Sequence, residues 1–342
     1  MRRSISTHFA LLFTSLLGAL VTLGSNPTHA ETVAPQGIYV AYGRALNERI
    51  LQAPYLVGAL VRVPWREVEP AEGRYDWTYL HREIDLAKRY GKKIALAVAA
   101  GPATPEWVYA AGAVPYKFTF GNPHSPRGGR QEQIPLPWDQ IYLGKWLRFI
   151  AALGREFGDD REIVLIHMTG SSKNGFELQL PDDPPRPRTG PPSGPWVERG
   201  YTRERFTESW QSIIDAYARA FPRQALDLEM HPILGDSSVA AQLADYGYQR
   251  LGKRFGTFGG WLSGQPPTWD SELHNIMAKQ CRLSFCNYQL IANETRQVQR
   301  FGPRGLLGAI QTGRDQGARY FEVWEADVKN PRFDADLLKI SR

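Results

Sequence analysis

The chain has 342 residues, a formal net charge of +6 at pH 7 and 42% hydrophobic residues. This apolar fraction can build a core and excludes global disorder, and the length suits one large α/β domain or two small ones. The basic residues are spread along the chain without a Lys- or Arg-rich block. We therefore do not expect nucleic acid as a partner.

The first 30 residues have the pattern of a secretory signal peptide. Arg2 and Arg3 precede an uncharged apolar run over residues 9–24, and Ala30 provides a small residue at the cleavage point. That run is shorter than the roughly 20 residues of a spanning helix, which favours cleavage after Ala30 over a retained membrane anchor. Cleavage leaves 312 of the 342 residues and removes two arginines, which lowers the net charge from +6 to +4. We expect a periplasmic or secreted monomer with no membrane insertion after cleavage.

Eight β-rich runs alternate with amphipathic stretches in residues 31–342. Alternation of this kind indicates βα units and a parallel sheet, and eight strands are the number that closes a (β/α)8 TIM barrel. The strands are expected at residues 37–42, 57–63, 93–99, 163–168, 225–230, 256–261, 285–291 and 319–324. Apolar residues at helical spacing predict helices at 79–90, 140–157, 207–221, 237–252, 270–280, 302–317 and 332–340.

Two long segments interrupt this rhythm. Residues 101–137 are rich in glycine, proline and aromatic residues, and residues 169–200 contain the run PDDPPRPRTGPPSGPW. The second segment has the composition of a linker between two domains. Both segments follow strand ends, however, where the loops of such barrels build the active site. We therefore interpret them as long strand-end loops of one domain.

The cysteines and histidines contain no metal motif. Cys281 and Cys286 are the only cysteines, and they either form a disulfide in an oxidising compartment or remain buried thiols. Two cysteines cannot form a four-ligand zinc site, and no HExxH motif occurs. We predict no metal and no cofactor.

Two glutamates follow the fourth and seventh predicted strands. Glu177 lies in the sequence HMTGSSKNGFELQLP and Glu294 in YQLIANET. Cleavage of a glycosidic bond needs one protonated carboxyl group for the leaving oxygen and one ionised carboxylate to attack or to stabilise the sugar cation. The environments of the two groups must separate their pKa values.

The residues from 60 to 108 resemble the second and third βα units of the clan A glycoside hydrolases. The matching residues are Arg62, Trp65, Glu69, Pro70, Gly73, Tyr75, Asp76, Trp77, Gly91, Thr104, Pro105 and Trp107. The resemblance implies that Glu177 is the acid/base and Glu294 the nucleophile of a retaining double displacement. The fourth strand departs from the clan pattern, because Met168, Thr169 and Gly170 stand where most members have Asn-Glu.

The resemblance also implies substrate-binding residues. Arg62 would hydrogen-bond Glu294, unless it forms an ordinary ion pair at the strand end. Trp324 would form the floor of the sugar site, because an indole packs against the apolar face of a sugar. Asn174 would contact the substrate in place of the missing strand-end asparagine. The remaining candidates are Trp65, Trp107, His231, Trp261 and Glu325, with core packing as the alternative for each Trp, while His167 is expected to pack inside the barrel.

These observations favour an exported retaining glycoside hydrolase that acts on a poly- or oligosaccharide. A barrel that binds carbohydrate without cleaving it is a second hypothesis, motivated by the irregular fourth strand. A third hypothesis is another enzyme on the same fold, such as a lyase or deacetylase. A requirement for a metal would distinguish it from the first two. Arg127, Arg130, Arg186 and Arg188 in the long loops would favour an acidic polysaccharide, unless they are simply solvated.

Overall fold

The computed structural model describes residues 1, 34–43, 45–121, 127–182, 194–264 and 271–341. The chain divides into two compact units, residues 1–31 and residues 32–342. Apart from Met1, the expected signal peptide lies outside the described residues, so cleavage and export remain predictions. Within the described part, no helix is both long and apolar enough to span a membrane.

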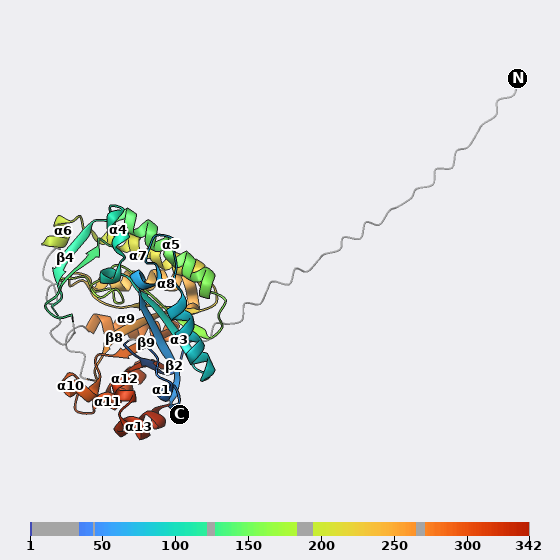
Figure 1. Cartoon of the computed structure of the whole chain (residues 1–342), viewed down its shortest axis with the longest axis vertical. Coiled ribbons are helices and arrows are strands. Elements are labelled where there is room, and N and C mark those ends of the chain that lie inside the picture. The colour runs from blue at the N-terminus through green and yellow to red at the C-terminus, as the bar shows by residue number, and fades with distance from the viewer. Residues whose placement is uncertain (2–33, 44, 122–126, 183–193, 265–270, 342) are drawn as a thin grey trace. The chain divides into compact units, whose positions relative to one another are not determined.

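The described residues from 34 onward form a closed barrel of eight parallel strands surrounded by helices (Figure 1). Around the barrel the strands follow the chain order, as short βα connections require. The runs enriched in Val, Ile, Leu and Ala are buried on both faces, which explains why they become central strands. The strands are β1 (Gly37–Ala41), β2 (Leu56–Pro64), β3 (Lys93–Ala99), β6 (Ile163–Met168), β7 (Ala225–Glu229), β8 (Phe255–Leu262), β9 (Phe285–Leu290) and β10 (Tyr320–Trp324). All eight predicted strands are present, and the (β/α)8 TIM barrel is confirmed.

The longer helices also match their sequence patterns. They are α3 (Thr78–Arg89), α5 (Gln140–Phe157), α7 (Arg203–Ala220), α8 (Ser237–Leu251), α9 (Ser271–Leu283), α11 (Gly305–Asp315) and α13 (Asp334–Ile340). Helix α7 begins four residues before its predicted start because the Thr202 side chain caps it by accepting from the Arg205 amide. The prediction missed the short helices α1 (Glu48–Leu51), α2 (Trp65–Val68), α4 (Glu106–Ala110), α6 (Pro195–Glu198), α10 (Glu294–Gln297) and α12 (Glu325–Val328).

The loop after β3 contains an unpredicted antiparallel hairpin of β4 (Pro115–Thr119) and β5 (Gln131–Pro135). Its Tyr116 ring stacks on Trp196 with 3.9 Å between ring centroids, and the Trp196 indole donates to the Pro181 carbonyl over 2.7 Å. The described ends of the Pro-rich segment thus pack on this hairpin, as expected for a strand-end loop of one domain. Its centre, residues 183–193, lies outside the described residues.

The barrel interior holds a buried ionic network. His167 on β6 contacts Asp227 on β7 over 2.7 Å and Glu322 on β10 over 2.9 Å. Burial opposes a charge on this ring, but the two carboxylates outweigh it and raise the pKa of His167 to about 10. The predicted position of His167 inside the barrel is confirmed.

A disulfide joins Cys281 at the end of α9 to Cys286 in β9. The sequence left open whether these cysteines form a disulfide or remain buried thiols, and the structure contains the disulfide.

Candidate active site

A cavity of about 520 Å³ opens at the carboxyl ends of the barrel strands. In such barrels this end carries the variable loops and the chemistry. The cavity is lined by Gly43, Arg62, Val63, Pro64, Arg66, Ala99, Pro102, Ala103, Phe120, Arg127, Arg130, Glu132, Asn174, Phe176, Glu177, Gly260, Gln289, Ile291 and Trp324. Strand ends form its floor, and the β4–β5 hairpin and the loop after β6 form its walls.

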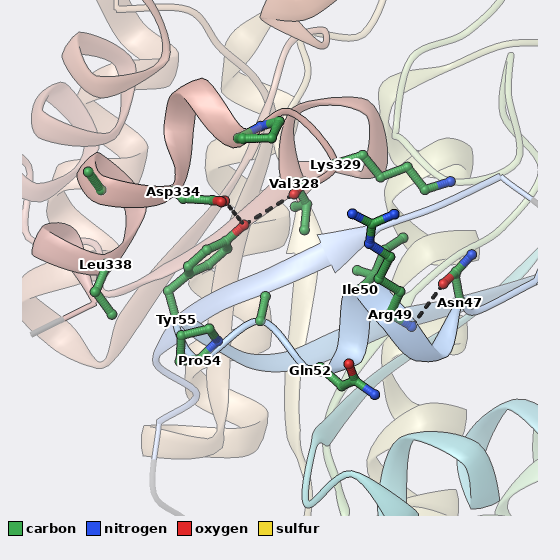
Figure 2. Close-up of a pocket in the computed structure, with 13 residues that line it drawn as sticks. Asn47, Arg49, Ile50, Gln52, Pro54, Tyr55, Val328, Lys329, Asp334 and Leu338 are labelled. Carbon is green, nitrogen blue, oxygen red and sulfur yellow. Dashed lines mark hydrogen bonds between the residues drawn. The ribbon is translucent and has the colours of Figure 1, made fainter.

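A second cavity, of about 600 Å³, lies beside α1 and α13 and is shown in Figure 2. The Tyr55 hydroxyl donates to the Val328 carbonyl over 3.2 Å and to Asp334 over 3.1 Å. Tyr55 precedes β2, so it enters this cavity from the amino end of a strand. This cavity does not collect strand carboxyl ends, and we place the candidate active site in the first one.

The loop after β6 is folded tightly enough to hold Glu177 in one position. The Asn174 side chain accepts hydrogen bonds from the amides of Phe176 and Glu177 over 3.0 and 2.9 Å. Gly175 has a φ of +76°, and a Cβ there would lie 2.2 Å from the Ala100 carbonyl oxygen. Only glycine therefore allows this loop to approach the end of β3 so closely.

The electrostatic environment of Glu177 suits a general acid. Burial and the nearby carboxylate of Glu229 raise the pKa of Glu177 to about 6, against the opposing effects of His231, Asn174 and Arg62. A side-chain oxygen from each of Glu177 and Glu229 and a ring nitrogen of His231 lie within 4.8 Å of one another. A carboxyl group of this pKa can hold a proton near neutral pH and release it to a leaving group.

Glu229 and His231 lie behind Glu177 and do not line the cavity. Glu229, at the end of β7, accepts from the Leu178 amide over 2.8 Å, and the His231 Nδ1 lies 3.5 Å from its other oxygen. His231 was expected to contact a sugar hydroxyl. Its position beside the two glutamates instead makes it part of the surroundings that set the pKa of Glu177.

The structure does not bring Glu294 to the cavity. Strand β9 ends at Leu290, the Asn293 side chain caps α10, and Glu294 lies in the first turn of that helix. Its carboxylate accepts from Arg332 over 2.6 Å and from the Leu306 amide over 2.5 Å, so it fastens α10 to α11 and to the C-terminal segment. The end of the seventh barrel strand presents Gln289 to the cavity, and this amide donates to Glu322 over 2.6 Å.

Arg62 lines the cavity as expected, but its predicted partner is wrong. Its guanidinium lies 5.2 Å from the centre of the Phe176 ring. Burial lowers the pKa of Arg62, while the charges of Glu322 and Glu177 oppose this shift. Because Glu294 is bound elsewhere, Arg62 acts on Glu177 and Glu322 rather than on the predicted nucleophile.

One of the four candidate tryptophans lines the cavity. Trp324, at the end of β10, donates to the Leu290 carbonyl over 2.6 Å and is only partly buried. Trp65 is fully buried and donates to Glu69, and Trp107 packs edge-on against it. Trp261 is buried against His274 and Tyr288. Core packing, the stated alternative, explains these three.

Glu325 begins α12 and pairs with Lys329, outside the cavity lining. Conversely, no catalytic candidate was predicted on the hairpin, although this segment contributes Phe120, Arg127, Arg130 and Glu132 to the cavity lining. Arg127 donates to Glu132 over 2.9 Å and lies 4.3 Å from the centre of the Phe120 ring. The sequence places these arginines in a loop, but no pattern in it indicates an antiparallel hairpin over the barrel mouth.

Comparison with known sequences agrees with the resemblance to clan A. The model of glycoside hydrolase family 42, described as beta-galactosidase, matches residues 49–174, a little over a third of the chain. That segment contains the second and third βα units on which the resemblance rests. No curated protein sequence matches the chain significantly.

Solved structures with the same fold are distant in sequence. The catalytic domain of a beta-amylase from Paenibacillus polymyxa has a TM-score of 0.62 and 13% identity, over 90% of this chain and 98% of that one. A beta-galactosidase from Halorubrum lacusprofundi has a TM-score of 0.56 and 12% identity, over 89% of this chain and 57% of that one. Xylanase 10B from Thermotoga petrophila has a TM-score of 0.51 and 9% identity, over 84% and 82% of the two chains.

At these identities the structures support the fold alone. The resemblance to clan A TIM-barrel glycosidases is confirmed, and the family match supports a glycosidase activity.

Proposed function

We propose that this chain is an exported glycoside hydrolase that cleaves an O-glycosidic bond of a poly- or oligosaccharide with Glu177 as its general acid. The observation that carries the proposal is a glutamate on the wall of a strand-end cavity, with a pKa raised to about 6. The protonated carboxyl group donates to the glycosidic oxygen as the bond to the anomeric carbon breaks. The partial match to a glycoside hydrolase family supports this reaction class.

The reaction also needs a second carboxylate. Glu294 is bound to Arg332 and Leu306, Glu229 is buried behind Glu177, and Glu322 is buried within the barrel network. Among the described residues, Glu132 is the other carboxylate that lines the cavity. We propose that Glu132 replaces Glu294 in the second role.

The stereochemical outcome depends on what Glu132 does. Retention requires that it attack the anomeric carbon, as in the double displacement expected from the sequence, whereas inversion requires that it activate a water molecule. Trp324 presents an indole at the same cavity, and we propose that a sugar ring packs against it.

One observation favours a second candidate function. The end of the seventh barrel strand presents the amide of Gln289, where the clan resemblance implies a nucleophilic carboxylate. A barrel that has lost this group could bind a saccharide without cleaving it, and Asn174, Gln289 and Trp324 would be its sugar contacts.

A single screen separates the two functions. The wild-type protein and the variants Glu177→Gln, Glu132→Gln and Glu294→Gln are incubated with a panel of aryl glycosides and polysaccharides, and products are measured by chromatography. We expect turnover by the wild type and by Glu294→Gln, and loss of activity of about 100-fold or more in Glu177→Gln on substrates with poor leaving groups. Proton NMR of the first product anomer then assigns retention or inversion.

Near-wild-type activity of Glu177→Gln would remove Glu177 from the mechanism. If the wild type binds a glycan of the panel but releases no product from it, the carbohydrate-binding function replaces the hydrolase. Activity that depends on Glu294 and not on Glu132 would restore the carboxylate pair expected from the sequence.

A further inference from the structure

The cavity wall carries an excess of positive charge. Four arginines line it, and they face two carboxylates. Arg62 comes from β2, Arg66 from α2, and Arg127 and Arg130 from the hairpin segment. Charges that converge on one concave surface from separate elements raise the local concentration of ligands of opposite charge.

These arginines differ in how far other groups of the protein engage them. Arg127 pairs with Glu132, which balances its charge within the wall. Arg66 donates from one nitrogen to the Pro102 carbonyl over 2.7 Å, a contact that holds the side chain without neutralising it. Within the described ranges, the exposed guanidinium of Arg130 has no hydrogen bond or ion pair.

Arg62 adds a charge deeper in the cavity. It is only partly exposed, and it interacts with the face of the Phe176 ring and with the charges of Glu322 and Glu177. Glu322 is already bound by His167, Gln289 and Tyr320. The acid role requires that Glu177 hold its proton, and in that state the net charge of the cavity wall becomes more positive.

We propose that the cavity selects an anionic saccharide, in which a carboxylate or sulfate group on a sugar ring binds to Arg66 and Arg130. This substrate class rests on the proposed glycosidase function and narrows it. The planar guanidinium group donates two parallel hydrogen bonds to a carboxylate or sulfate, which fixes orientation as well as charge. A neutral sugar would offer these two exposed cations no charge-assisted hydrogen bond.

The test measures binding, so that it does not depend on turnover. Calorimetry with the whole chain and with its Glu177→Gln variant compares oligogalacturonate with its methyl ester, which has the same ring without the charge. A sulfated galactan oligosaccharide and its desulfated form make the second matched pair. Arg66→Gln and Arg130→Gln are compared with the control variant Arg161→Gln. Arg161 is exposed and lies just before β6, at the end of that strand away from the cavity.

We expect at least one charged ligand to bind about 10-fold or more tightly than its neutral counterpart, and to lose affinity as salt is added. Each of Arg66→Gln and Arg130→Gln should weaken that ligand about 10- to 100-fold, as for the loss of a charge-assisted hydrogen bond. Binding of the neutral partner, and binding by Arg161→Gln, should stay unchanged. A preference for oligogalacturonate over its methyl ester identifies the bound group as a carboxylate. A preference for the sulfated galactan over its desulfated form identifies it as a sulfate.

Equal affinity for charged and neutral partners, no binding of either charged ligand, or indifference to both arginine substitutions would overturn the proposal. The outcomes also separate it from the proposed function. Selective binding of an anionic ligand without cleavage supports the substrate class and contradicts the hydrolase. Cleavage of neutral glycans with no preference for charge does the reverse.

Discussion

Replacement of Glu229 by glutamine should lower the pKa of Glu177 and shift the alkaline limit of activity to lower pH. The nearest side-chain oxygens of the two residues lie within 4.8 Å. At that distance two unit charges repel by about 3.5 kcal/mol at an effective dielectric constant of about 20. We expect a smaller effect on the pKa than this repulsion alone would give, because burial is the largest cause of the rise of the Glu177 pKa to about 6.

We therefore expect the pKa to fall by roughly one unit in Glu229→Gln. Glutamine keeps an oxygen that can accept from the Leu178 amide, so the loop that carries Glu177 should stay in place. A general acid works only while it is protonated, and activity falls as pH rises through its pKa. Removal of the like charge must therefore move this fall to lower pH.

The measurement is the pH profile of kcat/KM, with ¹³C NMR titration of the Glu177 carboxyl carbon as a readout that needs no substrate. Glu162→Gln is the matched control. Glu162 pairs with Lys93 just before β6 begins, at the end of the strand away from Glu177. An alkaline limit that stays in place or moves to higher pH in Glu229→Gln would refute the coupling. An equal shift of the alkaline limit in Glu162→Gln would show that the shift reflects the overall charge of the protein rather than the contact between Glu177 and Glu229.

Three further substitutions and one control substitution probe other parts of the molecule. Gly175→Ala forces a Cβ against the Ala100 carbonyl at positive φ, so it should cost about 1–3 kcal/mol of stability and lower kcat; wild-type unfolding and turnover would contradict the tight loop. His167→Leu leaves two buried carboxylates without their cation and should lower the free energy of unfolding by roughly 3–5 kcal/mol in urea; a loss below about 1 kcal/mol would mean that those carboxyl groups are protonated. Trp324→Ala should raise KM about 10-fold and change the free energy of unfolding little. Trp261 is buried outside the cavity, so Trp261→Ala should lower the free energy of unfolding and change KM little.

The local pattern of the sequence was sufficient for the barrel. Alternation of apolar strands with amphipathic helices depends on residues close together in the chain, so β3 and α5 appear at the residues predicted for them. Glu177 could also be located, because it follows a recognisable strand and is the one carboxylate between Glu162 and Asp182.

Residues far apart in the chain decided the rest. Asp327, 33 residues further on, accepts from the Glu294 amide over 2.9 Å and holds Glu294 in the first turn of α10. Only the folded chain shows that Arg332, 38 residues further on, binds this carboxylate. A match to a strand-end motif carries no information about such partners.

The sequence by itself determined an α/β barrel with a glutamate after the fourth strand, because strand burial and helix amphipathicity are set by neighbouring residues. The tertiary structure decided which side chains face one another across the mouth. It placed Gln289 at the seventh strand end and brought Arg130 and Glu132 over the cavity from a hairpin. The physical reason is that a catalytic site depends on distances and charges between side chains, and these exist only once the strands have closed into a barrel.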